Sequence, residues 1–366
     1  MEKPAYPFII PDIPRTSEWI PVYERVFETG IYANFGPISR SLETSLAARY
    51  AVSGYEAVTC CSATQGLLAA LLARFDAGMN IALPNFTFAA TYHAIRLAGL
   101  NPVPVDIDAD TLEISIESLA EAMGKMTLHG VVSVRPFGLV RDQSHLIAFC
   151  RDRRLPLTFD AAASLGGASL PKFGSDDGEV EVFSLHATKV FAIGEGGVIL
   201  APADAAVEIR KKLNFGFEAD RRYSTGTNGK MDELHAAIAL SQLGRVDEMQ
   251  QAREEIAHRY DSFFASVPGA RTLQGVTRGS GWTMYPVVFE GQSADEIVRK
   301  AQGRGIETRR YYWPSVSNAV GASLPTPVSL EVSNRVSNQI VCFPVYSANA
   351  GNLRDGLFEA LGGLFA

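Results

Sequence analysis

The chain has 366 residues, of which 47% are hydrophobic and 20% charged, a globular composition rather than a disordered or collagen-like one. At this length two domains of ordinary size are expected. The formal net charge of −7 argues against a dedicated nucleic-acid-binding protein, which would need a basic face. Prolines interrupt the N-terminal MEKPAYPFIIPDIP, and no apolar run reaches the length of a membrane span. We therefore predict a cytoplasmic protein without a signal peptide and with neither a nucleic-acid nor a membrane partner.

The cysteines and histidines show no sign of a metal centre. Cys60 and Cys61 are adjacent, whereas Cys150 and Cys342 are isolated, so neither zinc spacing nor a disulfide framework emerges. The six histidines are scattered. We expect buried free thiols and no metal ligands.

Between residues 60 and 200, short apolar runs alternate with helical patterns. The predicted helices cover residues 62–75, 89–99, 115–123 and 143–153. The predicted strands cover residues 79–84, 101–108, 129–134, 154–160 and 181–185. These strands are rich in Val, Ile, Leu and Phe with little alternation, which is typical of a mostly parallel sheet covered by helices on both faces. The sequence therefore predicts an α/β architecture.

The second half of the chain indicates a separate, smaller unit. A helical pattern over residues 231–267 is too long for one compact element and is expected to bend near Gly244. WTMYPVVFE, SADEIVRKAQGRG, IETRRYYW and a closing helix then indicate an α+β unit. The predicted division is an N-terminal segment 1–25, a large domain 26–245 and a small C-terminal domain 246–366.

Lys189 lies between two strand-like runs in FSLHATKVFAIGEGGVIL, residues 183–200. Burying an ammonium group without a partner is costly, so this lysine is either a solvated turn residue or a functional one. Desolvation would lower its pKa and free the amine to form a Schiff base. A phosphate-binding lysine of the Walker type is disfavoured because no G-x-x-x-x-G-K-[ST] pattern occurs. The segment alone does not show whether Lys189 is a solvated turn residue or a lysine that forms a Schiff base.

Two further features lie at the ends of predicted elements, where ligands of open α/β sheets collect. Ser62-Ala63-Thr64 opens a helix, either as an ordinary N-cap or as a phosphate seat. Asp160 ends an apolar strand, where it either caps the next element or pairs with a buried cationic ligand nitrogen. Combined with Ser184 and Lys189, they fit pyridoxal 5'-phosphate (PLP), which requires a lysine, an acidic partner for its ring nitrogen and phosphate ligands.

The sequence resembles the DegT/DnrJ/EryC1/StrS family of PLP-dependent sugar aminotransferases over roughly residues 25–345. The similar segments, in order, are CSATQGLLAALLA, FTFAATYHAIRLAGLNPVPVDID, FDAAASLGG, FSLHATKVFAIGEGGVIL, NFGF…GTNGKMDELHAAIALSQL and GIETRRYYWP. The resemblance implies the type I aminotransferase fold, with a mostly parallel seven-stranded sheet and a smaller C-terminal α+β domain. It also implies PLP as cofactor and a homodimer with shared active sites.

The resemblance further implies roles for single residues. Lys189 would bind the cofactor covalently and move the proton, and Asp160 would pair with the ring nitrogen. The other implied cofactor contacts are Phe88 on the ring, Ser62, Ala63, Thr64 and Ser184 at the phosphate, Ser164, and Asn228 at the phosphate of the other subunit. The implied substrate contacts are Arg135, Arg309, Arg310 and Tyr311.

The chain departs from the family pattern at two positions. Ala163 stands where most members carry His or Gln, which contacts the phenolic oxygen of the cofactor, although Ser164 is adjacent. Arg135 stands where many members carry His. Both departures fall near the cofactor and the substrate, so they affect the expected acceptor and the control of the cofactor.

The predicted reaction is a two-stage transamination. Glutamate is the expected amino donor, and a nucleotide-linked 4-keto-6-deoxyhexose is the expected acceptor. One alternative is a PLP-dependent sugar dehydratase on the same fold, although related dehydratases often replace the lysine with His. The other is a regulator that binds cofactor or sugar without turnover.

Overall fold

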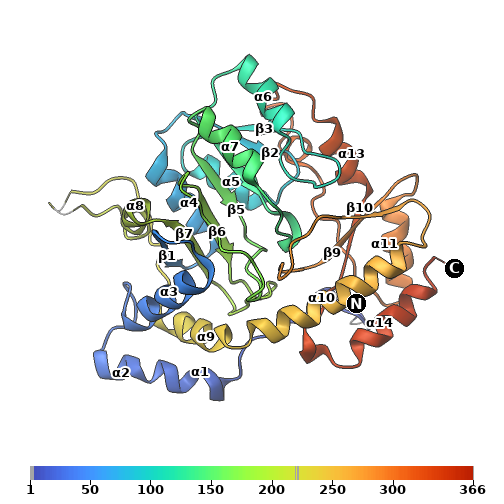
Figure 1. Cartoon of the computed structure of the whole chain (residues 1–366), viewed down its shortest axis with the longest axis horizontal. Helices are drawn as coiled ribbons and strands as arrows, with labels where there is room; N and C mark the ends of the chain where they lie inside the picture. The colour runs from blue at the N-terminus through green and yellow to red at the C-terminus, as the bar shows by residue number, and fades with distance from the viewer. Residues whose placement is uncertain (1–3, 219, 221, 366) are drawn as a thin grey trace.

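The computed structural model describes residues 4–218, 220 and 222–365. Its largest element is a seven-stranded sheet (Figure 1). In spatial order the strands are β1 (Tyr55–Cys60), β7 (Gly197–Pro202), β6 (Val180–Ser184), β5 (Leu157–Asp160), β4 (Gly130–Val134), β2 (Asn80–Pro84) and β3 (Asn101–Val105). β7 is antiparallel to both of its neighbours, and the other pairs are parallel. The predicted mostly parallel sheet is confirmed.

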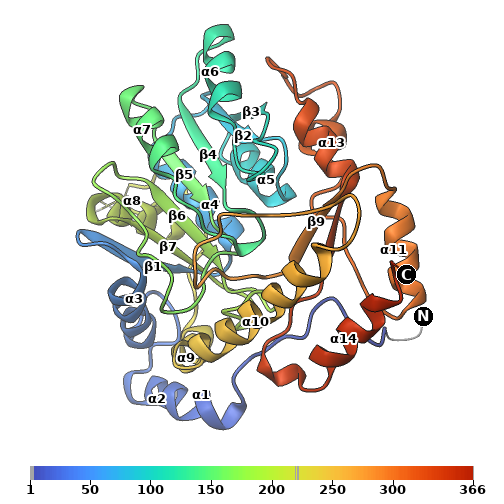
Figure 2. The same ribbon diagram turned by 45° about the vertical axis from the view of Figure 1, so that its right-hand side comes forward.

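Helices cover both faces of this sheet (Figures 1 and 2). One face packs against α4 (Ala63–Arg74), α5 (Ala89–Leu97) and α8 (Ala203–Leu213). The other packs against α3 (Pro37–Tyr50), α6 (Ile116–Lys125), α7 (Ser144–Asp152) and α9 (Glu233–Leu243). Within β4, Val132 packs on the face covered by α4, α5 and α8, and the neighbouring side chain, Val131, packs on the opposite face. Because both faces are buried, the strands are apolar throughout, which explains the lack of alternation in the sequence.

A smaller antiparallel sheet has the strand order β10 (Ile340–Phe343), β9 (Tyr285–Phe289), β8 (Ala270–Thr272). The helices of this half are α10 (Val246–Phe264), α11 (Ala294–Gly303), α12 (Val316–Val320), α13 (Glu331–Gln339) and α14 (Leu353–Gly362). α9 and α10 follow one another along the base of both sheets and are separated at Gly244 and Arg245, as the sequence predicted (Figure 1). The domain limits at residues 25 and 245 stay a prediction.

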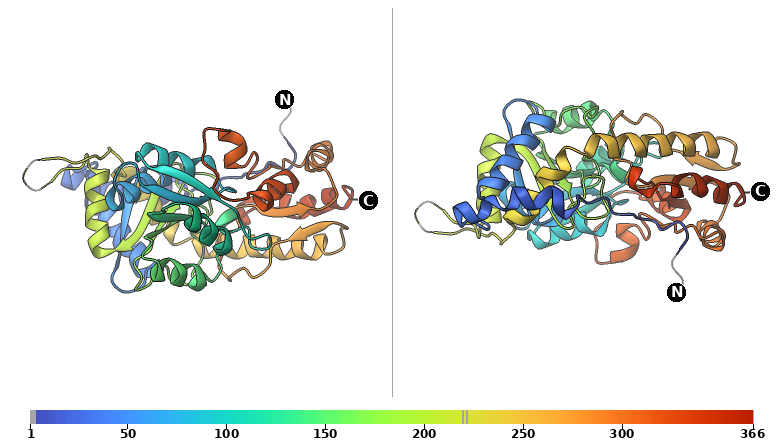
Figure 3. Two further views of the ribbon diagram at one scale, coloured as in Figure 1. Left: turned by 90° about the horizontal axis from the view of Figure 1, so that it is seen from above. Right: turned by 90° about the horizontal axis from the view of Figure 1, so that it is seen from below.

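The N-terminal residues contact both halves of the molecule. Tyr6 pairs with the backbone around Ile306, and Phe8 belongs to the core of the small sheet. The following helices, α1 (Thr16–Tyr23) and α2 (Arg25–Thr29), lie instead on the α9 side of the large sheet (Figure 1). The described residues of the loop between α8 and α9, 214–218, 220 and 222–232, project from the end of the molecule opposite the C-terminus (Figure 3). Among the described helices, none combines the length and the apolar character that a membrane span requires.

Candidate active site

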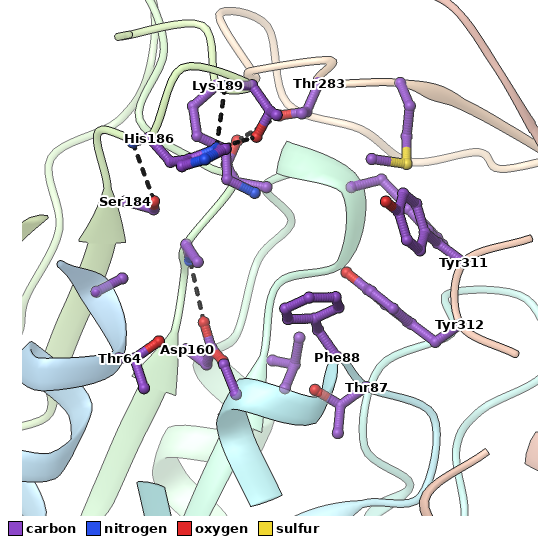
Figure 4. Close-up of a pocket in the computed structure, with 18 of the residues that line it drawn as sticks. Thr64, Thr87, Phe88, Asp160, Ser184, His186, Lys189, Thr283, Tyr311 and Tyr312 are labelled. Carbon is purple, nitrogen blue, oxygen red and sulfur yellow. Dashed lines mark hydrogen bonds between the residues drawn. The ribbon is translucent and has the colours of Figure 1, made fainter. Parts of the chain in front are cut away.

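A cavity of about 420 Å³ lies at the carboxyl ends of the parallel strands, where they approach the small sheet. Its wall combines residues from both halves of the molecule, from Phe8 to Tyr312 (Figure 4). Ten of the predicted site residues line it: Ser62, Ala63, Thr64, Phe88, Arg135, Asp160, Ser184, Lys189, Arg309 and Tyr311. The structure therefore brings most of the predicted set to one place.

The start of α4 forms one end of this cavity. Ser62 is the N-cap, and its hydroxyl accepts a hydrogen bond from the Gln65 backbone N–H at 3.3 Å. The N–H groups of Ala63 and Thr64 have no acceptor within the helix, and the helix dipole adds positive charge there. A Cβ placed on Gly197 would lie 2.7 Å from the Ala63 nitrogen, so glycine allows β7 to pass directly beneath this turn. Such an end suits a phosphate group.

Asp160 is held by two donors at the end of β5. The Thr91 hydroxyl donates to its Oδ2 at 2.7 Å, and the Ala162 backbone N–H donates to its Oδ1 at 3.2 Å. No helix lies between Asp160 and the start of β6 at Val180, so Asp160 caps a turn and not a helix. Burial raises the pKa of the Asp160 carboxyl, while the Thr91 and Ala162 hydrogen bonds and the charge of Lys189 lower it. A cationic partner would stabilise the ionised form of a carboxylate buried in this way.

Lys189 lies on the turn that joins β6 to β7. Its backbone N–H donates to the His186 carbonyl at 2.9 Å, and Ala187 donates to the Gly194 carbonyl at 2.8 Å. Gly194 has φ +106°, a conformation that L residues rarely adopt. Burial lowers the pKa of the Lys189 amine, and the charge of Asp160 opposes that shift. The turn thus presents a desolvated amine to the cavity, and the neutral form is the one that attacks a carbonyl carbon.

Aromatic side chains form the wall beside these two groups. Phe88, the N-cap residue of α5, keeps 54% of its surface exposed although it lies in the cavity. Its ring centroid is 6.3 Å from that of Tyr311 and 6.4 Å from that of Tyr312. An exposed aromatic face here offers a stacking surface to a planar ring.

The guanidinium groups of two predicted substrate contacts, Arg135 and Arg310, pair with carboxylates of the protein. Arg135 lines the cavity, but its guanidinium is buried and lies 2.6 Å from Glu181, above the ring of Phe159. Arg310 does not line the cavity and pairs with Asp295 at 2.6 Å. The carboxylates that bind these guanidinium groups are distant in sequence. The sequence alone could therefore not reveal where either arginine points.

Two predicted cofactor contacts also lie outside the cavity of their own chain. The Ser164 hydroxyl is fully buried, without a hydrogen-bond partner among the described residues, and Ser164 is absent from the lining. Asn228 lies on the loop between α8 and α9, where its Oδ1 accepts a hydrogen bond from Lys230 at 2.7 Å. Phe215 and Tyr223 of the same loop are exposed. The role of Asn228 in a second subunit stays a prediction.

Sequence reasoning missed several residues of the site. Thr91, which positions Asp160, follows Phe88 by three residues in the first turn of α5, and that spacing was an available signal. The missed lining residues include Phe8, Ile9, His186, Thr283, Met284 and Tyr312. Phe8 and Thr283 carry no local signal, because only the packing of the two sheets brings them to the cavity.

The DegT/DnrJ/EryC1/StrS aminotransferase family model matches residues 15–360. The chain belongs to this family. It is 28% identical to a dTDP-4-amino-4,6-dideoxy-D-glucose transaminase of Shigella dysenteriae, over 99% of both chains. Among solved structures, DesI in the presence of its TDP-sugar product is 28% identical with a TM-score of 0.86, over 99% of this chain and 93% of DesI. A putative PLP-dependent aminotransferase from Bacillus cereus shares the fold, at 24% identity and a TM-score of 0.89 over 98% of this chain and 99% of that one.

The protein is therefore a PLP-dependent aminotransferase with the type I fold, and its cavity fits PLP. The start of α4 suits the phosphate, Asp160 provides a buried carboxylate for the ring nitrogen, and Lys189 provides a desolvated amine. Phe88 offers the stacking face. Ala163, which also lines the cavity, offers no side-chain donor.

Proposed function

We propose that this aminotransferase moves an amino group from glutamate to a nucleotide-linked 4-keto-6-deoxyhexose. The observation that carries the reaction type is one cavity that joins the buried Lys189 and Asp160 to a helix start suited to phosphate. Similarity to a dTDP-4-amino-4,6-dideoxy-D-glucose transaminase supports this choice of acceptor, since that name describes a sugar with an amino group at C4 and no hydroxyl at C6.

Bound PLP supplies an aldehyde for covalent attachment and an electron sink for the substrate carbon that loses a proton. Lys189 provides the attaching amine, because its desolvation favours the neutral nucleophile. When not attached to the cofactor, the Lys189 amine would act as a general base, and its Nζ would take and return the substrate proton. Asp160, fixed by Thr91, keeps the ring nitrogen of the cofactor protonated.

Arg309 is the substrate-side residue that the geometry favours. Its guanidinium donates to the Tyr311 hydroxyl at 3.2 Å and pairs with Glu307 at 2.9 Å, at the cavity wall. The Arg309 side chain remains 42% exposed, so an incoming anion can reach it. We propose that it receives a carboxylate of the amino donor or the diphosphate of the acceptor. Tyr311 would contact the same ligand.

We further propose a homodimer in which Asn228 of one subunit reaches the phosphate end of the other subunit's cavity. The projecting loop and its exposed aromatic residues support this arrangement (Figure 3). The active site would then be complete only in the dimer.

The decisive experiment follows the visible absorbance of the PLP-loaded protein. Glutamate should remove the band of the aldehyde form, and aspartate or alanine should act more slowly. After glutamate is removed, dTDP-, UDP- and GDP-linked 4-keto-6-deoxyhexoses are tested one at a time. The correct acceptor should restore the band and yield an aminated sugar detectable by mass.

Other outcomes would identify the alternatives. A product lighter by one water, without gain of nitrogen, would indicate a dehydratase. No change with any amino donor would indicate a protein that binds without turnover and would contradict the proposal. Lys189→Ala, loaded with PLP in the same way, is the matched control, and glutamate should fail to convert its cofactor to the aminated form.

A further inference from the structure

The phenolic oxygen of PLP requires a hydrogen-bond donor that position 163 does not supply. This oxygen carries negative charge in the bound cofactor, and a buried anionic oxygen without a donor is costly. Ala163 lines the cavity three residues beyond Asp160 and has only a methyl group. The donor must therefore come from another part of the wall.

The covalent structure of PLP indicates on which side of the cavity the donor to the phenolic oxygen must lie. The phosphate arm and the phenolic oxygen are attached on opposite sides of the carbon that bears the aldehyde. If the phosphate binds at the start of α4 and the ring lies between Asp160 and Lys189, the phenolic oxygen faces away from α4. In Figure 4, Thr64 lies on one side of the line from Asp160 to Lys189, and Tyr311 and Tyr312 lie on the other.

Three other polar side chains near Ala163 are either engaged elsewhere or turned away from the cavity. The Thr283 hydroxyl donates to the Ala163 carbonyl at 3.1 Å. The Arg135 guanidinium is held by Glu181, and Ser164 does not line the cavity. These three groups are not available as donors without breaking a buried contact or turning toward the cavity.

The hydroxyl of Tyr312, in contrast, points into the cavity beside Phe88 (Figure 4). Its ring is fixed by stacking on Phe137 at 5.4 Å and 9°, and by an edge contact with Phe86 at 5.1 Å. Burial, followed by the charge of Asp160, raises the pKa of this phenol, so it stays protonated at all working pH values. The Phe137 backbone lowers this pKa by a smaller amount.

We propose that Tyr312 donates a hydrogen bond to the phenolic oxygen of PLP, replacing a donor at position 163. The inference rests on the proposed places of Lys189 and Asp160 at the cofactor. It does not depend on the acceptor sugar. Tyr311 is the natural comparison, because its hydroxyl faces Arg309 in the same loop.

The test compares Tyr312→Phe with Tyr311→Phe, both loaded with PLP and without substrate. The measured quantity is the pH midpoint at which the visible band of the Lys189-bound cofactor changes. The Tyr312 hydroxyl draws charge from the phenolic oxygen, so its loss leaves more negative charge beside the Lys189 nitrogen and keeps that nitrogen protonated to higher pH. We expect the Tyr312→Phe midpoint to rise by about one pH unit, as loss of one hydrogen bond to a charged group implies. Tyr311→Phe should keep the wild-type midpoint.

Ala163→Gln tests the same contact without altering Tyr312. A side-chain amide there should lower the midpoint of the wild-type protein and restore that of Tyr312→Phe. An unchanged midpoint in Tyr312→Phe, or an equal shift in Tyr311→Phe, would overturn the proposal. So would a visible band in Lys189→Ala that still changes with pH at the wild-type midpoint, since the titrating nitrogen would then not be that of Lys189. If the midpoints shift as expected but no keto-sugar is aminated, the proposed function fails and this inference stands.

Discussion

The guanidinium of Arg135 and the carboxylate of Glu181 form a buried ion pair, with Nη2 and Oε1 2.6 Å apart. A second hydrogen bond joins Nε of Arg135 to Oε2 at 3.1 Å, so the pair is bidentate. The guanidinium also lies 4.4 Å from the centroid of the Phe159 ring. This arrangement fixes the residue after β4 to the start of β6 across the intervening strand.

Arg135→Met should therefore destabilise the protein with little effect on catalysis. Loss of the guanidinium leaves Glu181 buried without its partner, which costs about 3–5 kcal/mol. Chemical denaturation should show this loss, whereas kcat per folded molecule should stay close to the wild-type value. A large rise in KM for the sugar in folded Arg135→Met would instead restore Arg135 as a substrate contact.

The double variant Arg135→Met/Glu181→Leu is the control for this interpretation. Replacing both partners removes the unpaired charge, so most of the lost stability should return. If the double variant is as unstable as Arg135→Met, packing against Phe159 and not the charge accounts for the loss.

Gly197→Ala should weaken the binding of PLP. The added methyl would lie 2.7 Å from the Ala63 nitrogen and from the Ser62 carbonyl carbon, so the first turn of α4 must move. Overpacking of this kind costs about 1–3 kcal/mol, and the displaced N–H groups would meet the phosphate poorly. Equilibrium dialysis or fluorescence titration with PLP measures the change. Gly244→Ala is the matched control, because no atom lies within 4 Å of its added methyl, and it should bind PLP normally.

Asp160→Asn should have opposite effects on the apoprotein and on the loaded enzyme. Burial holds the folded-state pKa of Asp160 above its ordinary value of 3.8, so the ionised carboxyl costs the apoprotein stability once the pH exceeds that value. The apo variant should melt higher than the wild type at pH 7, and the gap should close as the pH falls below about 4. With PLP the order should reverse, because the ring nitrogen loses its partner. Melting curves that differ by a constant amount at every pH would contradict this role of burial.

Shared active sites predict complementation between two defective subunits. A Lys189→Ala subunit still offers Asn228 to its partner, and an Asn228→Ala subunit still offers Lys189. After mixing and reassembly, about a quarter of the sites should be complete in a statistical population of dimers. Recovery of glutamate-dependent activity in the mixture measures this fraction. If each variant alone is inactive and the mixture also stays inactive, Asn228 does not act across a subunit boundary.

The positions of Asp160 and Lys189 could be predicted because backbone topology alone places them. Asp160 ends β5 and Lys189 follows the parallel strand β6, and such strand ends meet at one edge whatever the side chains do. The helix start at Ser62 follows from the same logic, with a local capping signal added. These residues needed only the element order, which the apolar pattern gives well.

The arginines could not be predicted in the same way. A long flexible side chain points toward its strongest partner, and Glu181 and Asp295 lie 46 and 15 residues away from the arginines that they bind. Tyr312 was missed for a related reason. The sequence places it beside Tyr311, but only the packing on Phe86 and Phe137 directs its hydroxyl inward.

The cavity wall begins at Phe8 and ends at Tyr312, so almost the whole chain must be in place before the cavity exists. Phe8 reaches it through the pairing of Tyr6 with Ile306, a contact between opposite ends of the chain. Closing so long a loop is slow relative to local helix formation. During refolding, cofactor capture should consequently be the last signal to appear, after the circular dichroism of the helices has recovered. The absorbance of bound PLP would then report the time at which folding is complete.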